Sequence, residues 1–345
     1  MYYFSEINIR GNHAGTKARN DVETILKNYG CKPINSKRYI LTSDESENIH
    51  SNVKNRLELS KFFFDLLTVR KKTVFVQYPM LSFDKAAKYL SKIAQHNNLV
   101  FIVHDVHGLK RQNQAEITQE ITMLNLASAI IVHNRFMEDK LKECGLSVAK
   151  IYRLNIFDYL YTGEIISDRT NESGIAFAGN LEKSEFFRHF CNANPEVPLH
   201  LYGQRFDERL STFQIIHYGG NFKPDEIPGK LVGKYGLVWD GDSIETCSGI
   251  FGEYTRYNNP HKLSLYLVAG MPVVVWEHAA IAEFVNNYGV GIAVNSLESL
   301  GKIINSISNE SYEIMLANVM SVRTQLLAGN NLKSILNQIE VDFGR

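Results

Sequence analysis

Short, continuous apolar runs separated by helical patterns constrain the fold of this chain more than any other feature. Residues 73–77, 99–104 and 129–133 are apolar along their length rather than alternately apolar and polar. Such strands must be covered on both faces, as in a parallel sheet that lies between layers of helices. The first half of the chain is therefore predicted to be Rossmann-like.

The N-terminal segment supports a β-loop-α start to this half. Residues 2–8 predict a strand, residues 11–16 a polar turn, and residues 17–29 a helix with apolar side chains at helical spacing. The turn lacks the order of glycines found in dinucleotide-binding loops. Thr16 is interpreted as a cap of the helix.

The same alternation resumes after a polar, tyrosine-rich segment at residues 155–173. The predicted strands are 174–178, 199–202, 215–218, 236–239, 272–276 and 289–294. A chain of 345 residues is also too long for one ordinary core. We expect two Rossmann-like α/β domains, residues 1–157 and 158–325, and a C-terminal helix, residues 326–345, that packs back on the first domain.

Composition excludes several classes of protein. Lysine plus arginine equals aspartate plus glutamate, at 37 each, so no net field attracts nucleic acid or anionic lipid. No apolar run reaches the roughly 20 residues of a membrane-spanning helix. The N-terminus lacks the pattern of an export signal, and the four scattered cysteines indicate reduced thiols rather than a zinc site. We expect a cytoplasmic protein; the basic residues 70–72 leave contact with the inner face of the membrane open, and homo-oligomerisation is also left open.

Residues 251–276 predict an anion site. A polar, aromatic loop leads into a helix that starts near Pro260 and carries Lys262, and a turn at residues 270–272 precedes a buried strand. Free N–H groups and the positive end of a helix dipole favour a phosphate, and a lysine adds a full charge. Pro260 suits the first helical turn, where no N–H is needed.

Small residues end two strands of the second half, where a ligand could approach the backbone. They are Gly179, followed by Asn180, and Gly203. A third strand end leads to Phe222, against which a nucleobase could rest.

The segment from His104 to His107 follows a predicted strand of the first half. Ligands of doubly wound sheets sit beyond such strand ends, so Asp105 is a candidate general base. The alternative is an aspartate that caps the next helix. His104 and His107 are interpreted as structural or gating residues rather than metal ligands, because no third ligand has a suitable spacing.

Two acidic motifs have alternative interpretations. Asp240-Gly241-Asp242 follows a strand and matches either a turn or the DxD metal site of a metal-dependent glycosyltransferase. Glu245 and Glu253 have the spacing of the glutamate pair of retaining nucleotide-sugar enzymes, but they lie in the wrong place. The corresponding positions are Tyr257 and Leu265, which weakens a retaining mechanism.

The segments VHDVHGLKR, FAGN, LYG, GLVWDG and residues 254–272 together resemble one family over residues 15–295. It is the group of bacterial GT-B glycosyltransferases that contains β-1,6-galactofuranosyltransferases and the glucosyltransferases that extend GlcNAc on serine-rich adhesins. The His107-Gly108 pair departs from this pattern.

The resemblance implies an N-terminal acceptor domain and a C-terminal domain that holds a UDP-sugar, with no catalytic metal and no further cofactor. It implies that Lys262, Tyr254, Tyr257 and Asn258 surround the diphosphate, and that Gly179, Asn180 and Gly203 line the same cleft. It also implies that Asp105, Gly15, Thr16 and Lys17 face the acceptor, with His104 beside them.

The leading hypothesis is a metal-independent, inverting hexosyltransferase. It would move galactofuranose or glucose from UDP to a sugar hydroxyl of a surface polysaccharide or a glycoprotein glycan, with Asp105 as base and Lys262 at the leaving group. The alternatives are a non-catalytic nucleotide-sugar-binding partner subunit and a DxD metal enzyme.

Overall fold

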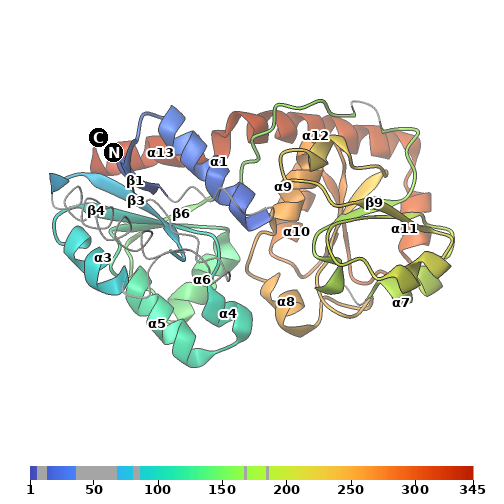
Figure 1. Ribbon diagram of the computed structural model, residues 1–345, viewed down its shortest axis with the longest axis horizontal. Coiled ribbons are helices and arrows are strands. Elements are labelled where there is room, and N and C mark those ends of the chain that lie inside the picture. Colours follow the sequence, from blue (N-terminus) through green and yellow to red (C-terminus); the bar gives the residue numbers. More distant parts are fainter. Residues whose placement is uncertain (6–13, 36–67, 81–85, 167–168, 184–185, 345) are drawn as a thin grey trace, which may run out of the picture. The chain divides into compact units, whose positions relative to one another are not determined.

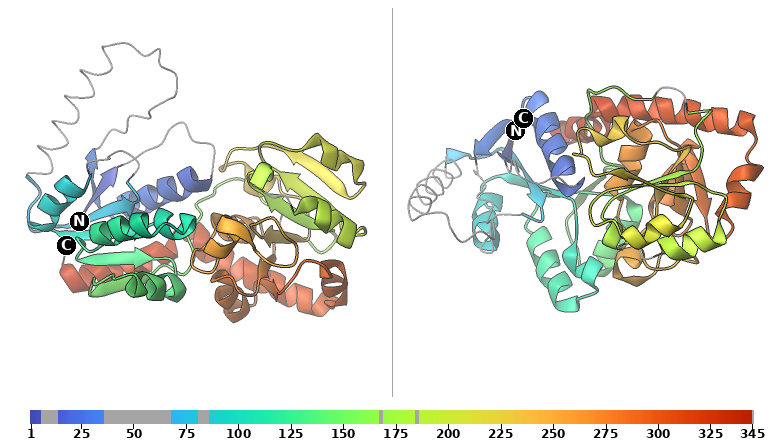
Figure 2. Two further views of the ribbon diagram at one scale, coloured as in Figure 1. Left: turned by 90° about the horizontal axis from the view of Figure 1, so that it is seen from below. Right: turned by 45° about the vertical axis from the view of Figure 1, so that its right-hand side comes forward.

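The computed structural model describes residues 1–5, 14–35, 68–80, 86–166, 169–183 and 186–344. These residues form two compact units (Figure 1). Unit 1 comprises Met1–Leu109, Asn113–Leu154 and Leu332–Arg345, and unit 2 comprises Lys110–Gln112 and Asn155–Asn331. Both chain ends lie side by side in unit 1 (Figure 2).

Unit 1 contains a sheet of six described strands, all parallel, in the order β2-β1-β3-β4-β5-β6. Their bounds are β1 (Tyr2–Ser5), β2 (Lys32–Asn35), β3 (Thr73–Tyr78), β4 (Asn98–Val103), β5 (Ala129–Val132) and β6 (Lys150–Arg153). This is the order of flavodoxin-like sheets with one added strand, and its switch point lies between β1 and β3.

The burial of these strands follows their sequences. The side chains of β3 and β5 are all buried, as the apolar runs predict, whereas β6 at an edge is partly exposed. β2 was not predicted, because this edge strand is short, polar and contains Pro33, which only an edge strand tolerates. Of the predicted first strand, residues 6–8 lie outside the described residues.

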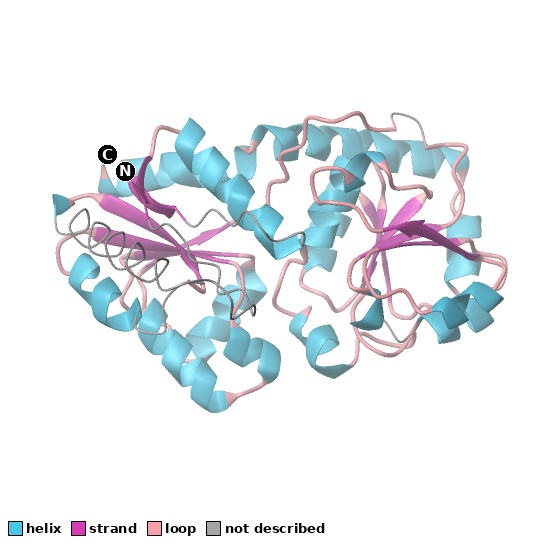
Figure 3. Ribbon diagram, in the orientation of Figure 1, coloured by secondary structure: helices cyan, strands magenta, loops and turns pink. Residues whose placement is uncertain are grey.

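Helices cover both faces of this sheet (Figure 3). Their bounds are α1 (Ala14–Asn28), α3 (Ala86–Ala94), α4 (His107–Arg111), α5 (Gln114–Leu124), α6 (Arg135–Glu143) and α13 (Asn330–Phe343). α1 and α13 lie on one face, and α3 and α5 lie on the other (Figure 1). The predicted return of the C-terminal helix is confirmed: Tyr29 donates to Glu340 at 2.9 Å, and Lys150 pairs with Asp342 at 2.8 Å.

Unit 2 contains a second parallel sheet, in the order β12-β11-β10-β7-β8-β9. Its strands are β7 (Ile175–Ala178), β8 (Leu199–Tyr202), β9 (Ile216–Gly220), β10 (Tyr235–Val238), β11 (Val273–Trp276) and β12 (Gly291–Val294). In chain order this is the Rossmann arrangement 3-2-1-4-5-6. The prediction of two Rossmann-like domains is therefore confirmed.

The helices of unit 2 include α9, which carries Lys262, and the long α12, which packs against it. Their bounds are α7 (Phe187–Ala193), α8 (Gly249–Tyr254), α9 (His261–Val268), α10 (Ile281–Tyr288), α11 (Leu300–Ser306) and α12 (Asn309–Ala328), with 3₁₀ turns at Leu181–Lys183, Glu208–Thr212 and Ile227–Gly229. No helix in the described ranges is both long enough and apolar enough to cross a bilayer.

Three local predictions are wrong. The stretch before Pro260 is not all loop, because α8 occupies its first part behind Ser248 at the N-cap position. Pro260 is the N-cap of α9 rather than a residue of its first turn, with an extended backbone at ψ 133°. Thr16 is not a cap, because α1 already begins at Ala14. Residues 11–13 of the predicted turn lie outside the described residues.

Candidate active site

The sheet of unit 2 places two strand ends at the point where its winding reverses. From β7 the chain continues to β8 and β9 on one side, and from β10 it continues to β11 and β12 on the other. Ligands of open α/β sheets bind beyond the carboxyl ends of the strands at this point. Gly179 follows β7 here, and Trp239 and Asp240 follow β10.

Lys262, the second residue of α9, reaches this switch point. Its Nζ donates to Asp240 Oδ1 at 2.9 Å and to the Trp239 carbonyl at 3.4 Å, and it lies 4.3 Å from the centre of the Phe177 ring. Its side chain is only 17% exposed. A lysine in the first turn of a helix is unfavourable against the dipole, and here it is also largely removed from water. Lys262 is therefore not a solvated surface lysine.

Glycines end the neighbouring strands at positions where a Cβ would be crowded by other atoms. A Cβ on Gly179 would lie 3.2 Å from Cε of Lys262. Gly203 has φ +140°, and a Cβ there would lie 1.8 Å from the Gly179 carbonyl oxygen, so no other residue fits. Backbone hydrogen bonds from Gly179 to Tyr202 and from Gly203 to Gly220, both 2.9 Å, extend the pairing of β7, β8 and β9 to these glycines.

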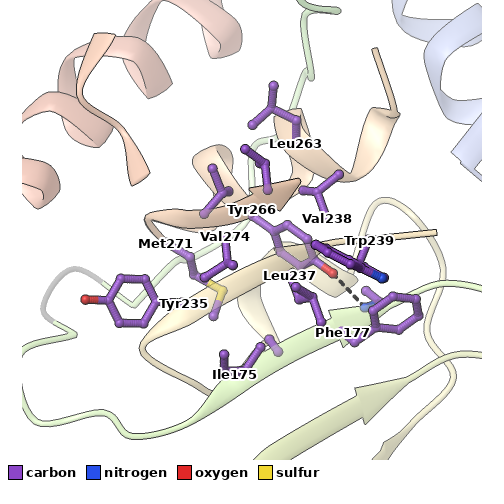
Figure 4. Packing of buried hydrophobic residues seen from close by; sticks show 14 of the residues in the cluster. Ile175, Phe177, Tyr235, Leu237, Val238, Trp239, Leu263, Tyr266, Met271 and Val274 are labelled. Atoms are coloured by element: carbon purple, nitrogen blue, oxygen red, sulfur yellow. Dashed lines mark hydrogen bonds between the residues drawn. The ribbon is translucent and has the colours of Figure 1, made fainter. Parts of the chain in front are cut away.

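Tyr266 fixes α9 to the sheet one turn after Lys262. Its ring crosses β10 at Gly236, where an added Cβ would lie 2.2 Å from the ring. Its buried hydroxyl accepts a hydrogen bond of 2.7 Å from the backbone N–H of Ala178 (Figure 4). Burial raises the pKa of Tyr266, so the hydroxyl stays protonated. The helix with Lys262 and the strand end with Gly179 are thereby held together.

Replacement of Tyr266 by phenylalanine tests this anchor. The ring is retained, but the buried N–H of Ala178 loses its partner, so we expect the free energy of unfolding to fall by about 1–3 kcal/mol in urea denaturation. Tyr288→Phe is the matched control, because Tyr288 is 50% exposed and its hydroxyl is not buried. Equal stability of both variants would contradict the anchoring role.

The Asp240-Gly241-Asp242 motif directs its two carboxylates to different partners. Asp240 pairs with Lys262, and Asp242 accepts a hydrogen bond from the hydroxyl of Ser248. Gly241 has φ +121°, and a Cβ on it would lie 2.4 Å from the Ser248 carbonyl oxygen, so the motif is a tight turn. Among the residues that the structure describes, no three acidic, histidine or cysteine side chains are grouped as metal ligands.

Asn258 places a polar atom near the start of α9. Its Oδ1 is buried and has no hydrogen-bond partner within the described part of the chain. A buried carbonyl oxygen without a partner is costly, and it is suited to accept a hydrogen bond from a ligand. Tyr254 is buried at the end of α8 and Tyr257 is partly buried in the turn that follows. Contact of these three residues with a diphosphate stays a prediction.

The other predicted donor residues lie further along the same sheet edge. Asn180 is exposed, and its side chain accepts from the N–H of Glu182 at 3.2 Å. Phe222 lies beside Gly220 at the end of β9. Since β9 is two strands from β7, Phe222 is about 10 Å across the sheet from Gly179. A ligand that contacts both would have to be extended.

In unit 1, Asp105 and His104 follow β4, the neighbour of β3. His104 Nε2 lies 2.7 Å from Oε1 of Gln77. His133, at the end of β5, is buried, and burial lowers its pKa to about 4 although Asp105 opposes the shift. His133 is therefore neutral at neutral pH and places no positive charge beside Asp105.

Gly15, Thr16 and Lys17 lie in the first turn of α1 rather than in a loop. Gly15 is exposed, but Thr16 is 3% exposed and Lys17 is 6% exposed. Lys17 pairs with Asp21, one turn later, at 2.6 Å. Their role in acceptor binding stays a prediction.

The sequence did not reveal Asp240 as the partner of Lys262, nor the roles of Tyr266 and His133. Only Tyr266 carried a signal: it lies four residues after Lys262 and therefore on the same face of the helix.

The architecture is similar to that of several solved structures, among them a glycosyltransferase and a sucrose-phosphate synthase. WaaG, a glycosyltransferase involved in lipopolysaccharide biosynthesis, matches with a TM-score of 0.54, 11% identity and coverage of 97% of this chain and 98% of its own. The sucrose-phosphate synthase of Thermosynechococcus elongatus matches with a TM-score of 0.54 and 15% identity over 91% of this chain and 82% of its own. The chain thus has the GT-B fold of glycosyltransferases.

The sequence comparisons identify the family. Models of the N-terminal and C-terminal domains of glucosyltransferase 3-like proteins match residues 1–156 and 175–339. The chain belongs to the glucosyltransferase 3-like family, as its motifs predicted. It is 29% identical to beta-1,6-galactofuranosyltransferase WbbI of Escherichia coli (strain K12) over 99% of both chains. It is 28% identical to glucosyltransferase 3 of Streptococcus gordonii over 92% of both.

Proposed function

We propose that this glycosyltransferase transfers a hexose, galactofuranose or glucose, from a UDP-hexose to a sugar hydroxyl of a surface glycan carried on lipid or protein. The choice of hexoses rests on the names of its relatives. The observation that carries the proposal is the position of Lys262, partly buried at the switch point between the ends of β7 and β10. A cation there can meet the negative charge that develops on UDP as the glycosidic bond breaks.

The proposed donor site uses residues of unit 2. The diphosphate lies at the start of α9, against the bare backbone of Gly179 and Gly203 and beside Lys262. Asp240 holds the ammonium group at the strand ends in a hydrogen bond of 2.9 Å. The buried Oδ1 of Asn258 accepts a hydrogen bond from a hydroxyl of the donor, and Phe222 supports the base.

The proposed reaction is a single displacement with inversion. Asp105 accepts the proton of the acceptor hydroxyl, the acceptor oxygen bonds to the anomeric carbon, and the bond from that carbon to the UDP oxygen breaks. One base suffices, and the positions that carry glutamates in retaining relatives hold Tyr257 and Leu265. The separate partners of Asp240 and Asp242 support a mechanism without a metal.

A transfer assay with UDP-glucose and UDP-galactofuranose in excess EDTA tests this proposal. We expect UDP release and glycan product at an unchanged rate, because Lys262 rather than a metal carries the leaving-group charge. Asp242→Asn should also stay active. Loss of activity in EDTA that manganese restores would favour the DxD metal enzyme. Donor binding by thermal shift without turnover on any glycan acceptor would favour a non-catalytic partner subunit.

A further inference from the structure

The segment that carries Asp105 is held on its N-terminal side by β3. The N–H of His104 donates to the carbonyl of Tyr78 at 2.7 Å, and its ring contacts Gln77 in the same strand. On the other side of Asp105, the side chain of Val106 is fully buried. Asp105 therefore lies between His104 and Val106, which are both held in place. The direction of the Asp105 side chain then depends on the contacts at the C-terminal end of the segment.

Glu120 of α5 holds that other end. Its Oε1 accepts from the N–H of His107 at 2.9 Å, and its Oε2 accepts from the N–H of Gly108 at 2.7 Å. Charge-assisted hydrogen bonds of this kind are stronger than neutral ones. α4 has only five residues and would not be stable without such contacts. Glu120 thus supplies both oxygens of one carboxylate to the first two N–H groups of α4.

Tyr78 lies near both ends of the segment. Burial together with the nearby Glu120 carboxylate raises the pKa of Tyr78. Its ring packs edge-on against Phe101 with 5.6 Å between centroids. The carbonyl of Tyr78 accepts a hydrogen bond from His104, and its side chain lies near Glu120, so one residue of β3 neighbours both sides of Asp105.

Gly108 allows α5 to pack closely against α4. A Cβ on Gly108 would lie 2.4 Å from the backbone N of Ile117 and 2.9 Å from Ile117 Cα. A larger residue would push α4 away from α5 and from Glu120. This contact gives a physical reason for the glycine after His107, which departs from the family pattern.

We propose that Glu120 is a positioning residue for glycosyl transfer: its carboxylate, together with Tyr78, aims the Asp105 side chain at the acceptor hydroxyl. The inference rests on the proposed role of Asp105 as base. A base must lie within hydrogen-bond reach of the proton that it removes, and a displacement near 1 Å can cost about a hundredfold in rate. Glu120 acts through Asp105, because its two carboxylate oxygens accept from the N–H groups of His107 and Gly108.

Glu120→Gln tests the proposal in the full-length chain. Glutamine keeps one acceptor oxygen but turns an NH₂ group toward the second backbone N–H, so the segment shifts. We expect kcat to fall about ten- to a hundredfold with the KM for UDP-hexose unchanged. Tyr78→Phe, which removes only the hydroxyl near Glu120, should cause a smaller fall. Glu143→Gln on α6 is the control, because that carboxylate is exposed and pairs only with Lys140 in the described structure.

A double-mutant cycle with Asp105→Asn separates the two proposals. If Glu120 acts through Asp105, its substitution should not further lower the residual rate of Asp105→Asn. An additional full loss in the double variant, or wild-type kcat in folded Glu120→Gln, would overturn the positioning role. Thermal melting measures the amount of folded protein. A loss of rate that only matches a loss of folded protein would also overturn the positioning role. Wild-type activity of Asp105→Asn alone would instead refute the assignment of the base.

Discussion

Lys262→Ala should lower the kcat for glycosyl transfer by about a hundred- to a thousandfold, the cost of removing one preorganised charge partner from a transition state. The ammonium group lies between the ends of β7 and β10, where its side chain is 17% exposed, so water cannot replace it well. UDP affinity should fall as well, because the diphosphate carries charge before and after transfer. Steady-state kinetics and UDP titration by calorimetry measure both effects.

Lys262→Arg tests whether activity depends on the positive charge of this side chain alone or also on its shape. The aliphatic stem of Lys262 passes 3.2 Å from the position of a Cβ on Gly179, and the ammonium group lies over Phe177. A planar guanidinium is wider than an ammonium group and should restore only part of the activity. Lys302→Ala on α11 is the control for loss of an exposed lysine. A rate within threefold of wild type in folded Lys262→Ala would contradict the donor site.

Asp105→Asn should lower kcat by about a hundred- to ten-thousandfold, the contribution expected of a positioned general base. Asparagine keeps the size and one oxygen of the side chain but cannot accept the proton of the acceptor hydroxyl. UDP-hexose binding should be unchanged, because the residues proposed to bind the donor lie in unit 2. Thermal shift with UDP and the transfer rate with acceptor measure the two properties separately.

A neighbouring histidine should not restore the transfer rate of Asp105→Asn. His133 does not replace the base, because it is buried and its pKa is about 4. Asp139→Asn on the exposed side of α6 is the control. A wild-type rate in Asp105→Asn would show that another group removes the proton.

The sequence predicted well those strands and helices whose apolar pattern is compatible with only one type of secondary structure. β3, β5 and β11 are continuous apolar runs and lie buried within their sheets. α12 and α13 have the apolar spacing of packed helices, and their buried residues match that spacing. β2 escaped prediction because an edge strand needs no apolar pattern, and α8 escaped because short helices depend on tertiary contacts.

For the candidate site, the sequence pointed to residues of a type that is unusual for their place in a helix or strand. Lys262 stands at the wrong end of a helix dipole, and Gly203 stands where a strand ends. Their partners could not be predicted in this way. Asp240 meets Lys262 from 22 positions away, Tyr266 reaches Ala178 across 88, and Glu120 holds His107 across 13. Each of these pairs exists only because strands and helices distant in sequence are neighbours in the fold.

The sequence alone determined two parallel α/β domains and the family, and it led to the proposal of an anion site at the start of α9, because periodicity and helix-end chemistry are local properties of the chain. Only the tertiary structure decided which charge faces Lys262, which tyrosine anchors its helix to the sheet, and which carboxylate aims Asp105. The order of strands in a sheet sets these contacts, and strand order is a property of the whole fold rather than of any one segment.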